Sequence, residues 1–325
     1  MSEAGNAMIP VFRSAAEVPR DFGPCIASIG NFDGVHRGHQ QILSAVASEA
    51  EQRGMRSIAI TFHPHPAQFL YPADAPKLIS FLPERLRLLA ATGVDAILVL
   101  PFDKSLSCLS ARDFVRDILV GALGVRGMHE GSNFRFGHGA RAGVRELAEF
   151  GAEFGFRLQV HSAVRVHRLE VSSSAVRGLI STGDMRCARW MLGRPFAVFS
   201  FPARGRGVGS RLLVPTVNLA EYGELLPGFG VYVTRMTIGE RCFQAVTNVG
   251  NRPTFEGAGF GVETHILNFE PIDLTEDTPL KLEFLLRLRG EQTWPSPDAL
   301  KVQILKDVAK ARRYFQLAET RTTSG

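Results

Sequence analysis

The sequence predicts an α/β domain built on a parallel sheet, followed by an antiparallel β domain that ends in a helix. As far as about Ala188, short apolar runs alternate with amphipathic runs, which is typical of strand–helix–strand units. After Pro195, apolar and polar residues alternate within short runs between Gly and Pro turns. The 325 residues suffice for two cores. We therefore expect two domains, residues 1–190 and residues 191–325.

In the first domain, each expected element follows from a short apolar or amphipathic run. The expected strands are 25–29, 57–62 and 96–100, and the expected helices follow His39, span 84–91 and begin after a capping box at Ser110. Repeated units of this kind predict a parallel sheet with helices on both faces. Ligands of such sheets bind beyond the carboxyl ends of the strands.

In the second domain, alternating runs predict strands at 231–234, 242–246, 262–267 and 282–285. These strands favour an antiparallel barrel or sandwich. A closing helix should start with Ser296 as its cap and Pro297 in its first turn. Its predicted buried face is Leu300, Ile304, Val308 and Ala311.

Composition excludes some classes of protein. The net charge of +5 suits an enzyme of phosphorylated ligands and a weak nucleic-acid binder equally well, so charge alone does not choose between them. The chain does lack the Lys and Arg blocks of a dedicated nucleic-acid surface. The longest apolar run, near 96–100, is too short to span a membrane, and the first residues do not read as a signal peptide. The scattered cysteines form no C-x-x-C pair, so we expect ordinary thiols and a cytoplasmic protein.

The segment from Gly30 to His39 is the most informative motif, because it lies between an apolar strand and an amphipathic helix. Glycines let the backbone approach a ligand, and the start of a helix favours an anion. Two histidines can donate hydrogen bonds to phosphate oxygens. The candidate nucleotide-binding residues are Gly30, Asn31, Phe32, Asp33, His36 and His39.

This segment is neither a Walker A loop nor a dinucleotide fingerprint. Its H-x-G-H pair resembles the signature of nucleotidyltransferases, which release pyrophosphate from a nucleoside triphosphate. The alternatives are half of a zinc site or two solvent-facing histidines. Zinc would need three or four ligands, and only Asp33 is near. The glycines and the strand-to-helix position favour the nucleotide site.

Other polar motifs should reach the same edge of the sheet. Residues 62–66 follow the second strand, and residues 131–137 follow a run near Val125. Ser173 and Ser174 open a helix, where serines either cap the helix or hold a triphosphate. Arg177 nearby favours the phosphate interpretation.

From about Cys25 to Phe315, the chain resembles the bacterial bifunctional riboflavin kinase and FMN adenylyltransferase family, also called FAD synthetases. The resemblance rests in the first half on residues 29–39, 61–66, 133–137 and 172–174 with Arg177. In the second half it rests on residues 215–218, 230–232, 248–255 and 263–265. Each motif alone is weak evidence, but their joint order is highly specific.

The resemblance implies that the first half is a Rossmann-like nucleotidyltransferase domain, in which the phosphate of FMN attacks the α-phosphate of ATP to give FAD. His36 and His39 would then steady the phosphates. Ser173, Ser174 and Arg177 would hold the triphosphate, and Asn133 would contact nucleotide or metal. Phe62, His63 and Pro64 would line the flavin side, although Phe62 fits a core position equally well.

For the second half, the resemblance implies phosphorylation of riboflavin by ATP. Thr216 and Asn218 of a Pro-Thr-x-Asn motif would hold Mg²⁺ and the ATP phosphates, with Gly209 beside them. Glu263 matches the family's general base for the 5′-hydroxyl of riboflavin. Without the resemblance, Glu263 would be interpreted as a solvent-facing strand residue.

Ser210 and Ala175 each stand where relatives have Arg, and Leu213 stands where they have Gly. Ser174 stands where they have Thr, which keeps the hydroxyl. These departures affect expected rates and nucleotide affinity rather than chemistry. Two alternatives follow, namely a protein with one activity, or a flavin- or nucleic-acid-binding regulator on the same scaffold. A regulator would be expected to lose catalytic residues, yet His36, His39, Thr216, Asn218 and Glu263 are present.

Overall fold

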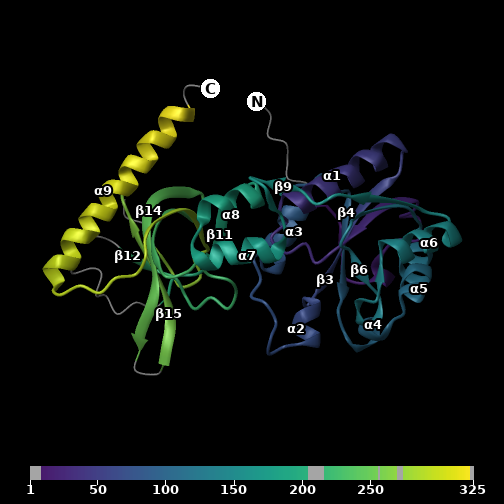
Figure 1. The fold of residues 1–325 in the computed structure, drawn as a ribbon, viewed down its shortest axis with the longest axis horizontal. Helices are drawn as coiled ribbons and strands as arrows, with labels where there is room; N and C mark the ends of the chain where they lie inside the picture. The colour runs from purple at the N-terminus through teal and green to yellow at the C-terminus, as the bar shows by residue number, and fades with distance from the viewer. Residues whose placement is uncertain (1–8, 204–215, 255–256, 269–273, 323–325) are drawn as a thin grey trace. The chain divides into compact units, whose positions relative to one another are not determined.

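The computed structural model describes residues 9–203, 216–254, 257–268 and 274–322. Spatial contacts divide the chain into two units, residues 1–173 and residues 174–325 (Figure 1). Helix α8 (Met185–Leu192) and nearly all of α7 (Ser173–Thr182) therefore belong to the second unit. The expected boundary near residue 190 remains a prediction about where the chain can be cut into active parts.

The first unit is built on a parallel sheet with the strand order β1-β4-β3-β2-β5-β8. Its strands are β1 (Val11–Phe12), β2 (Cys25–Ile29), β3 (Arg56–His63), β4 (Ala96–Pro101), β5 (Val125–Gly131) and β8 (Arg157–His161). Every neighbouring pair is parallel, which confirms the predicted Rossmann-like class. The sequence did not reveal β1 or β8.

Helices connect these strands. They are α1 (Arg37–Gln52), α2 (Pro66–Leu70), α3 (Leu82–Ala90), α4 (Lys104–Cys108), α5 (Ala111–Asp113) and α6 (Val144–Phe154). The Ser110 hydroxyl accepts the Asp113 N–H at 3.1 Å, which confirms the predicted cap. The helix that it starts continues as a π-helical segment, η2 (Phe114–Ala122).

Short elements complete the first unit. They are the single turns η1 (Ala15–Glu17) and η3 (His138–Ala140), and the hairpins β6 (Arg135–Phe136) with β7 (Ala142–Gly143) and β9 (Arg165–Val166) with β10 (Leu169–Glu170).

The chain order reverses between β2 and β5. From β2 the chain passes to β3 and β4 on one side, then returns to β5 and β8 on the other. Direct β2–β5 pairing ends at Ala27 opposite Met128, whereas β2 pairs with β3 as far as Ile29. Parallel sheets bind ligands where the strand order reverses in this way.

The second unit contains an antiparallel sheet with the strand order β11-β16-β13-β14-β15-β12. The strands are β11 (Phe196–Ser200), β12 (Thr216–Asn218), β13 (Gly230–Ile238), β14 (Arg241–Thr254), β15 (Gly257–Ile266) and β16 (Leu280–Arg289). A bridge between Pro202 and Leu219 joins the two outer strands, and the Ala203 N–H donates to the Asn218 carbonyl at 2.8 Å. The sheet thus curves into the predicted barrel.

The barrel interior contains a chain of hydroxyls among its apolar side chains. Thr234, Thr247 and Thr264 are fully buried, with Oγ1–Oγ1 distances of 2.8 Å and 3.0 Å along the chain. The three residues come from β13, β14 and β15. Buried polar groups require such partners, so these three hydroxyls stabilise the observed alignment of β13, β14 and β15.

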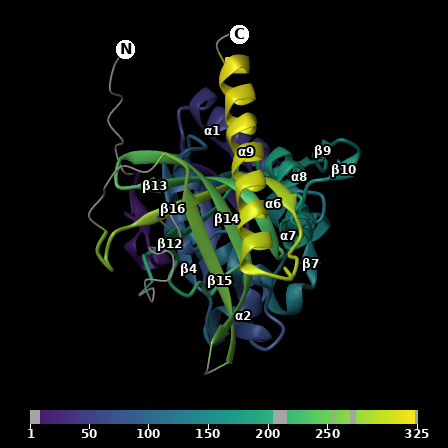
Figure 2. The same cartoon turned by 90° about the vertical axis from the view of Figure 1, so that its left-hand side faces the viewer.

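Helix α9 (Pro297–Thr322) lies along β14 and β13 (Figure 2). The Ala299 N–H donates to the Ser296 hydroxyl at 3.2 Å, which confirms the predicted cap. The predicted buried face is wrong in its first half, because Leu300 and Ile304 are 39% and 40% exposed. The face that is buried consists of Asp307, Ala311 and Phe315. The reason is that α9 packs against the barrel only in its later turns.

Candidate functional site

The turn between β2 and α1 carries two histidines next to the point where the strand order reverses. His36 is the N-cap of α1, and its Nδ1 accepts the His39 N–H at 3.3 Å. Because Nδ1 is an acceptor, a neutral His36 carries its proton on Nε2. The His36 and His39 rings are stacked with centroids 3.6 Å apart, and the Phe32 ring meets His39 edge-on at 5.1 Å. The two imidazoles are therefore held as one rigid pair.

His39 is a neutral imidazole near pH 7. Burial, together with the positive charge that His36 can carry, lowers the pKa of His39 well below its ordinary value. Its Nδ1 is buried and has no hydrogen-bond partner among the described residues. A buried nitrogen without a partner is costly unless a ligand supplies one. This atom therefore points to a ligand at the turn.

The turn is held in a strained shape. Phe32 and Val35 have φ values of 48° and 37°, which is unfavourable for side chains with a Cβ. Gly34 has φ 76°, and a Cβ there would lie 2.8 Å from Ile79 Cγ2, so only glycine fits. Strained backbone of this kind is concentrated at functional sites.

Asp33 stabilises this shape. Its buried carboxylate accepts the N–H groups of Ile79 and Ser80 at 3.0 to 3.1 Å. The Ser173 hydroxyl donates to the Asp33 carbonyl at 2.9 Å. The Asp33 carboxylate is thus used by the turn itself, and any contact with ATP at this position would come from the main chain.

Arg85 connects two predicted motifs, and the sequence reasoning missed it. Its side chain is fully buried and donates to the Asn31 carbonyl at 2.8 Å and to the Phe62 carbonyl at 3.3 Å. It thereby joins the nucleotide turn to the predicted flavin segment. The available signal was a charged residue four positions before Leu89, on the apolar face of α3.

Glu130 connects β5 to β2, and the sequence reasoning missed it as well. Its Oε1 accepts the Ile29 N–H at 2.7 Å, beyond the last direct pair of β2 and β5. Burial raises the pKa of this carboxyl well above its ordinary value. Glu130 therefore replaces the missing strand pairing and fixes the residue that precedes Gly30.

Glu130→Gln should stabilise the protein increasingly as the pH rises. The unfolded chain releases this proton near the ordinary pKa of 4.5, while the folded chain keeps it to higher pH. Between these two pKa values the folded state binds more protons than the unfolded state. The free energy of unfolding of the parent therefore falls by up to about 1.4 kcal/mol per pH unit. Gln keeps the acceptor for Ile29 and cannot ionise. Urea unfolding at about pH 5 and about pH 8 measures the difference.

The matched control for this prediction is Glu51→Gln, on an exposed position of α1. Its effect on the free energy of unfolding should not change with pH. If Glu130→Gln changed the free energy of unfolding by the same amount at both pH values, Glu130 would ionise normally in the folded state.

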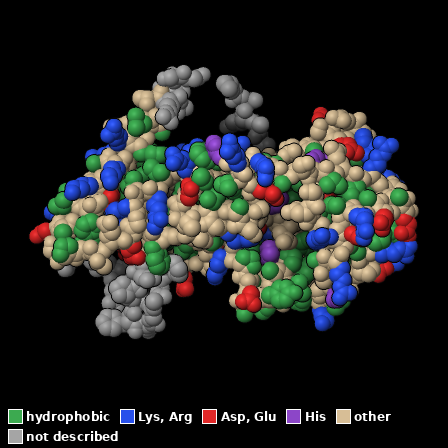
Figure 3. Space-filling view, viewed as in Figure 1, with side chains coloured by type: hydrophobic (Ala, Val, Ile, Leu, Met, Phe, Trp, Pro, Cys, Tyr) green, Lys and Arg blue, Asp and Glu red, His purple; other side chains and the backbone are tan. Residues whose placement is uncertain are grey.

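The predicted flavin segment lies at the end of β3 beside an aromatic cluster. The Phe62 and Phe69 rings each lie against Phe102, with centroids 5.8 Å and 5.9 Å away. Burial, then the charges of Arg85 and Arg13, lowers the pKa of His63. The surface over α2 is apolar (Figure 3), and its exposed large side chains are Phe69, Leu70 and Tyr71. Phe69 and Phe102 were not singled out from the sequence.

Asn133 follows β5 and is exposed. Its segment is fixed by the Ser132 N–H, which donates to the His161 carbonyl at 3.1 Å. Ser173, at the first position of α7, is tied to the nucleotide turn through Asp33. Ser174, Ala175 and Arg177 follow in α7 within the second unit, so their approach to the turn remains a prediction.

In the second unit, strand pairing gathers the predicted kinase residues. Asn218 of β12 lies opposite Glu263 of β15, and Thr216 lies opposite His265. Residues directly opposite share one face of a sheet. Val217 and Thr264, between them, are buried on the inner face. Two oxygen ligands and a carboxylate thus stand together on the outer face of the barrel.

Helix α9 packs on the neighbouring part of this outer face. Val246 lies opposite His265 on β14, and it belongs to the same apolar cluster as Ala311 and Phe315. The predictions for Gly209, Ser210 and Leu213 fall outside the described residues. In the described part of the chain, no three His, Cys, Asp or Glu side chains gather as a metal site.

These features define two classes of enzyme on one chain. Paired histidines at the start of a helix suit the stabilisation of a transferring phosphate. Hydroxyl, amide and carboxylate oxygens on one face of the barrel suit Mg²⁺ and a general base. The FAD synthetase family model matches residues 18–175, and the riboflavin kinase model matches residues 192–315. The chain belongs to the bifunctional riboflavin kinase/FMN adenylyltransferase family.

Curated relatives match almost the whole chain. The bifunctional enzyme of Escherichia coli K12 is 33% identical over 91% of this chain and 94% of its own length. That of Pseudomonas fluorescens is 37% identical over 89% and 92%. A crystal structure described as a macrolide-efflux protein from Streptococcus pneumoniae has a TM-score of 0.84 at 24% identity, covering 94% of this chain and 99% of that one. This last likeness shows a shared fold alone.

Proposed function

We propose that this chain makes FAD from riboflavin at two separate sites. The barrel transfers the γ-phosphate of ATP to riboflavin and gives FMN, and the parallel-sheet unit joins FMN to the AMP part of a second ATP and releases pyrophosphate. The observation that carries the kinase assignment is the pairing of Asn218 with Glu263 across β12 and β15. Both family models, each confined to one half of the chain, support the division of labour.

At the adenylyl site, an oxygen of the FMN phosphate attacks the α-phosphorus of ATP, and the bond from that phosphorus to the β-bridging oxygen breaks. His39, which is neutral, and His36 donate ring N–H groups to phosphate oxygens. Negative charge on these oxygens increases in the transition state. The N-terminus of α1 adds its dipole. Ser173, Ser174, Arg177 and Asn133 hold the leaving pyrophosphate and the nucleotide. The buried Nδ1 of His39 supports this assignment.

On the flavin side, the isoalloxazine ring of FMN packs against Phe62, Phe69 and Phe102. Their edge-to-face contacts leave apolar surface at the end of β3. Flat aromatic ligands are stabilised by such surfaces. His63 and Pro64 border this surface, since they end β3 and precede α2.

At the kinase site, Glu263 accepts the proton of the riboflavin 5′-hydroxyl as that oxygen attacks the γ-phosphate. The oxygens of Thr216 and Asn218 fit Mg²⁺, which prefers a few protein oxygens together with phosphates and water. When bound, Mg²⁺ neutralises charge on the ATP phosphates. The pairing of Asn218 with Glu263 supports a single site that contains both the base and the oxygen ligands.

Incubation of the purified protein with riboflavin, ATP and Mg²⁺ tests the whole proposal. Chromatography should show FMN first and FAD later. An unchanged riboflavin peak, with no FAD from supplied FMN either, would exclude the enzyme and favour a binding protein. FAD from supplied FMN but no FMN from riboflavin would leave a single activity.

The two activities should separate when the chain is cut. Helix α8 packs on β11 and β16 and buries Met185, Ala188, Met191 and Leu192. A fragment of residues 174–325 should therefore fold and make FMN without FAD. The shorter fragment 191–325 loses the burial of Met185 and Ala188, and large apolar side chains contribute about 1.5–3 kcal/mol each. The 191–325 fragment should therefore have a lower melting temperature than the 174–325 fragment when unfolding is followed by circular dichroism. A folded 174–325 fragment that makes no FMN would contradict the assignment.

A cytoplasmic location is part of the proposal. The four cysteines are unpaired, as is typical of a reducing compartment. Among the described residues, no helix has both the length and the apolar character to cross a membrane.

A further inference from the structure

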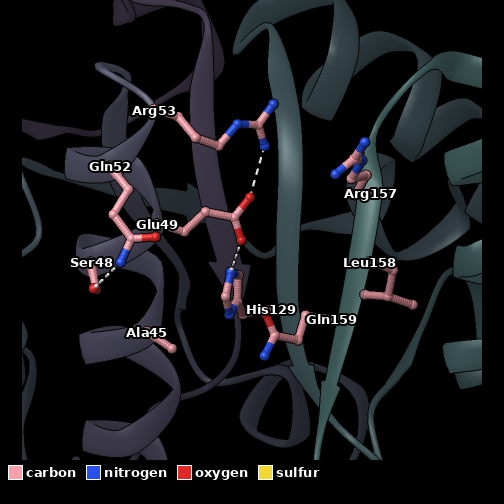
Figure 4. A pocket seen from close by; sticks show the side chains of 9 residues that line it. All are labelled: Ala45, Ser48, Glu49, Gln52, Arg53, His129, Arg157, Leu158 and Gln159. Atoms are coloured by element: carbon pink, nitrogen blue, oxygen red, sulfur yellow. Dashed lines mark hydrogen bonds and ion pairs between the residues drawn. The ribbon is translucent and has the colours of Figure 1, made fainter.

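A pocket of about 640 Å³ opens between the end of α1 and the edge strand β8 (Figure 4). It lies over the first residues of β8, whereas the nucleotide turn lies at the other end of α1. The helix has 16 residues, so at 1.5 Å per residue the pocket is about 20 Å from His36. Neither proposed reaction uses this pocket.

A chain of hydrogen bonds forms one side of the pocket. Arg53 Nη1 donates to Glu49 Oε1 at 2.7 Å, and His129 Nε2 donates to Glu49 Oε2 at 2.7 Å. His129 is buried, and its Nδ1 lies 3.0 Å from His161 Nε2. Burial raises the pKa of Glu49, but the bonds from Arg53 and His129 outweigh it and hold the pKa below its ordinary value. Glu49 is therefore ionised, with both oxygens in use.

Arg157 gives the pocket its net charge. It extends from β8 on the wall opposite Arg53 (Figure 4), and it forms no ion pair with any described residue. The positive charge of Arg53 neutralises the negative charge of Glu49, so the net positive charge of the pocket comes from Arg157. Gln52 and Gln159 add amide donors. The lining thus offers donors to a ligand while its one carboxylate is occupied.

Gly127 keeps the space for this arrangement. A Cβ at this position would lie 2.8 Å from Ile26 Cδ1, 3.1 Å from Glu49 Oε1 and 3.4 Å from Arg53 Nη1. Any larger residue would press on the Arg53–Glu49 pair, so the main chain of β5 is adapted to it.

We propose that this pocket binds a small organic anion through Arg157, with Arg53 and the two glutamines completing the contact. Its volume is that of a small-molecule site, and guanidinium groups pair with phosphate or carboxylate in two-point contacts. The shared chemistry is an oxyanion on a polar molecule of sugar-phosphate size. A ligand here would meet the last turn of the helix whose first turn carries His36.

Calorimetry on the full chain tests this site with ribose 5-phosphate, inorganic phosphate and citrate as probes. Arg157→Ala should weaken binding of at least one probe about tenfold or more, because a charge-assisted contact is lost. The matched control is Arg126→Ala, which removes the same charge from an exposed position of β5 outside the pocket. It should leave the affinity unchanged.

The proposed catalytic sites also bind phosphates and contribute heat of binding. The pocket is therefore assessed from the difference in binding heat between the parent and Arg157→Ala. Loss with the phosphate probes alone assigns a phosphorylated ligand, and loss with citrate alone assigns a carboxylate. If no probe at millimolar concentration loses heat in Arg157→Ala, the proposal is overturned. Equal weakening by Arg157→Ala and Arg126→Ala would also overturn it, since general charge would then explain the binding.

Discussion

Glu263→Gln should remove FMN formation while FAD formation from supplied FMN continues at the parental rate. The side chain lies on the outer face of β15 opposite Asn218, and Gln keeps its size but not its basicity. General-base assistance contributes about 100- to 10,000-fold, so kcat for riboflavin should fall by that factor. Because the residue is exposed, folding should be unchanged.

Glu240→Gln is the matched control, since Glu240 is an exposed carboxylate in the β13–β14 turn of the same barrel. Both reactions should be unaffected by it. Should Glu263→Gln make FMN within a few-fold of the parent, Glu263 would be no more than a solvent-facing strand residue.

Changing His39 or His36 to Ala should have the opposite effect, strongly slowing FAD formation from FMN and sparing FMN formation from riboflavin. Loss of one preorganised donor to a transferring phosphate costs roughly 3 kcal/mol, or about 100-fold in rate. His39 is already neutral near pH 7, because its pKa is lowered, and it keeps one ring N–H to donate. Above that pH, the rate of FAD formation should therefore show no step from His39.

His36 needs a separate control because it also caps α1. Loss of an N-cap costs about 1 kcal/mol of stability. His36→Asn keeps an acceptor for the His39 N–H but removes the imidazole, so it should fold like the parent and still fail to make FAD. Zinc ligation predicts a different result, namely stoichiometric zinc and inhibition by a chelator in excess magnesium. Parental rates in both histidine variants would refute the proposed nucleotide site.

Much of the fold was predictable because it depends on local periodicity. The buried run 25–29 became β2 with the predicted bounds, and the glycine-rich turn after it leads into α1 as expected. Local patterns carry this information because each apolar face must be covered. The prediction of a buried face was wrong for the first turns of α9. Which turns of a helix pack against a sheet depends on tertiary contacts, and local periodicity does not contain this information.

The residues that connect the motifs were not predictable. Arg85 and Glu130 bind main-chain atoms of Asn31 and Ile29, which lie far away in sequence. No spacing rule joins such partners. Sequence reasoning found Asn218 and Glu263 separately, but their pairing depends on the alignment of β12 with β15. Asp33 was predicted to contact the nucleotide, which remains a prediction, and nothing in the sequence indicated that its carboxylate accepts the N–H groups of Ile79 and Ser80.

The buried threonines of the barrel have a consequence for catalysis. Sliding β15 by one residue would turn Glu263 into the interior and Thr264 to solvent, because side chains alternate along a strand. Such a shift would separate Thr264 from Thr247 and bury an unpartnered carboxylate. The three buried hydroxyls therefore disfavour a one-residue shift of β15 that would turn Glu263 away from the outer face, where we propose that it meets riboflavin.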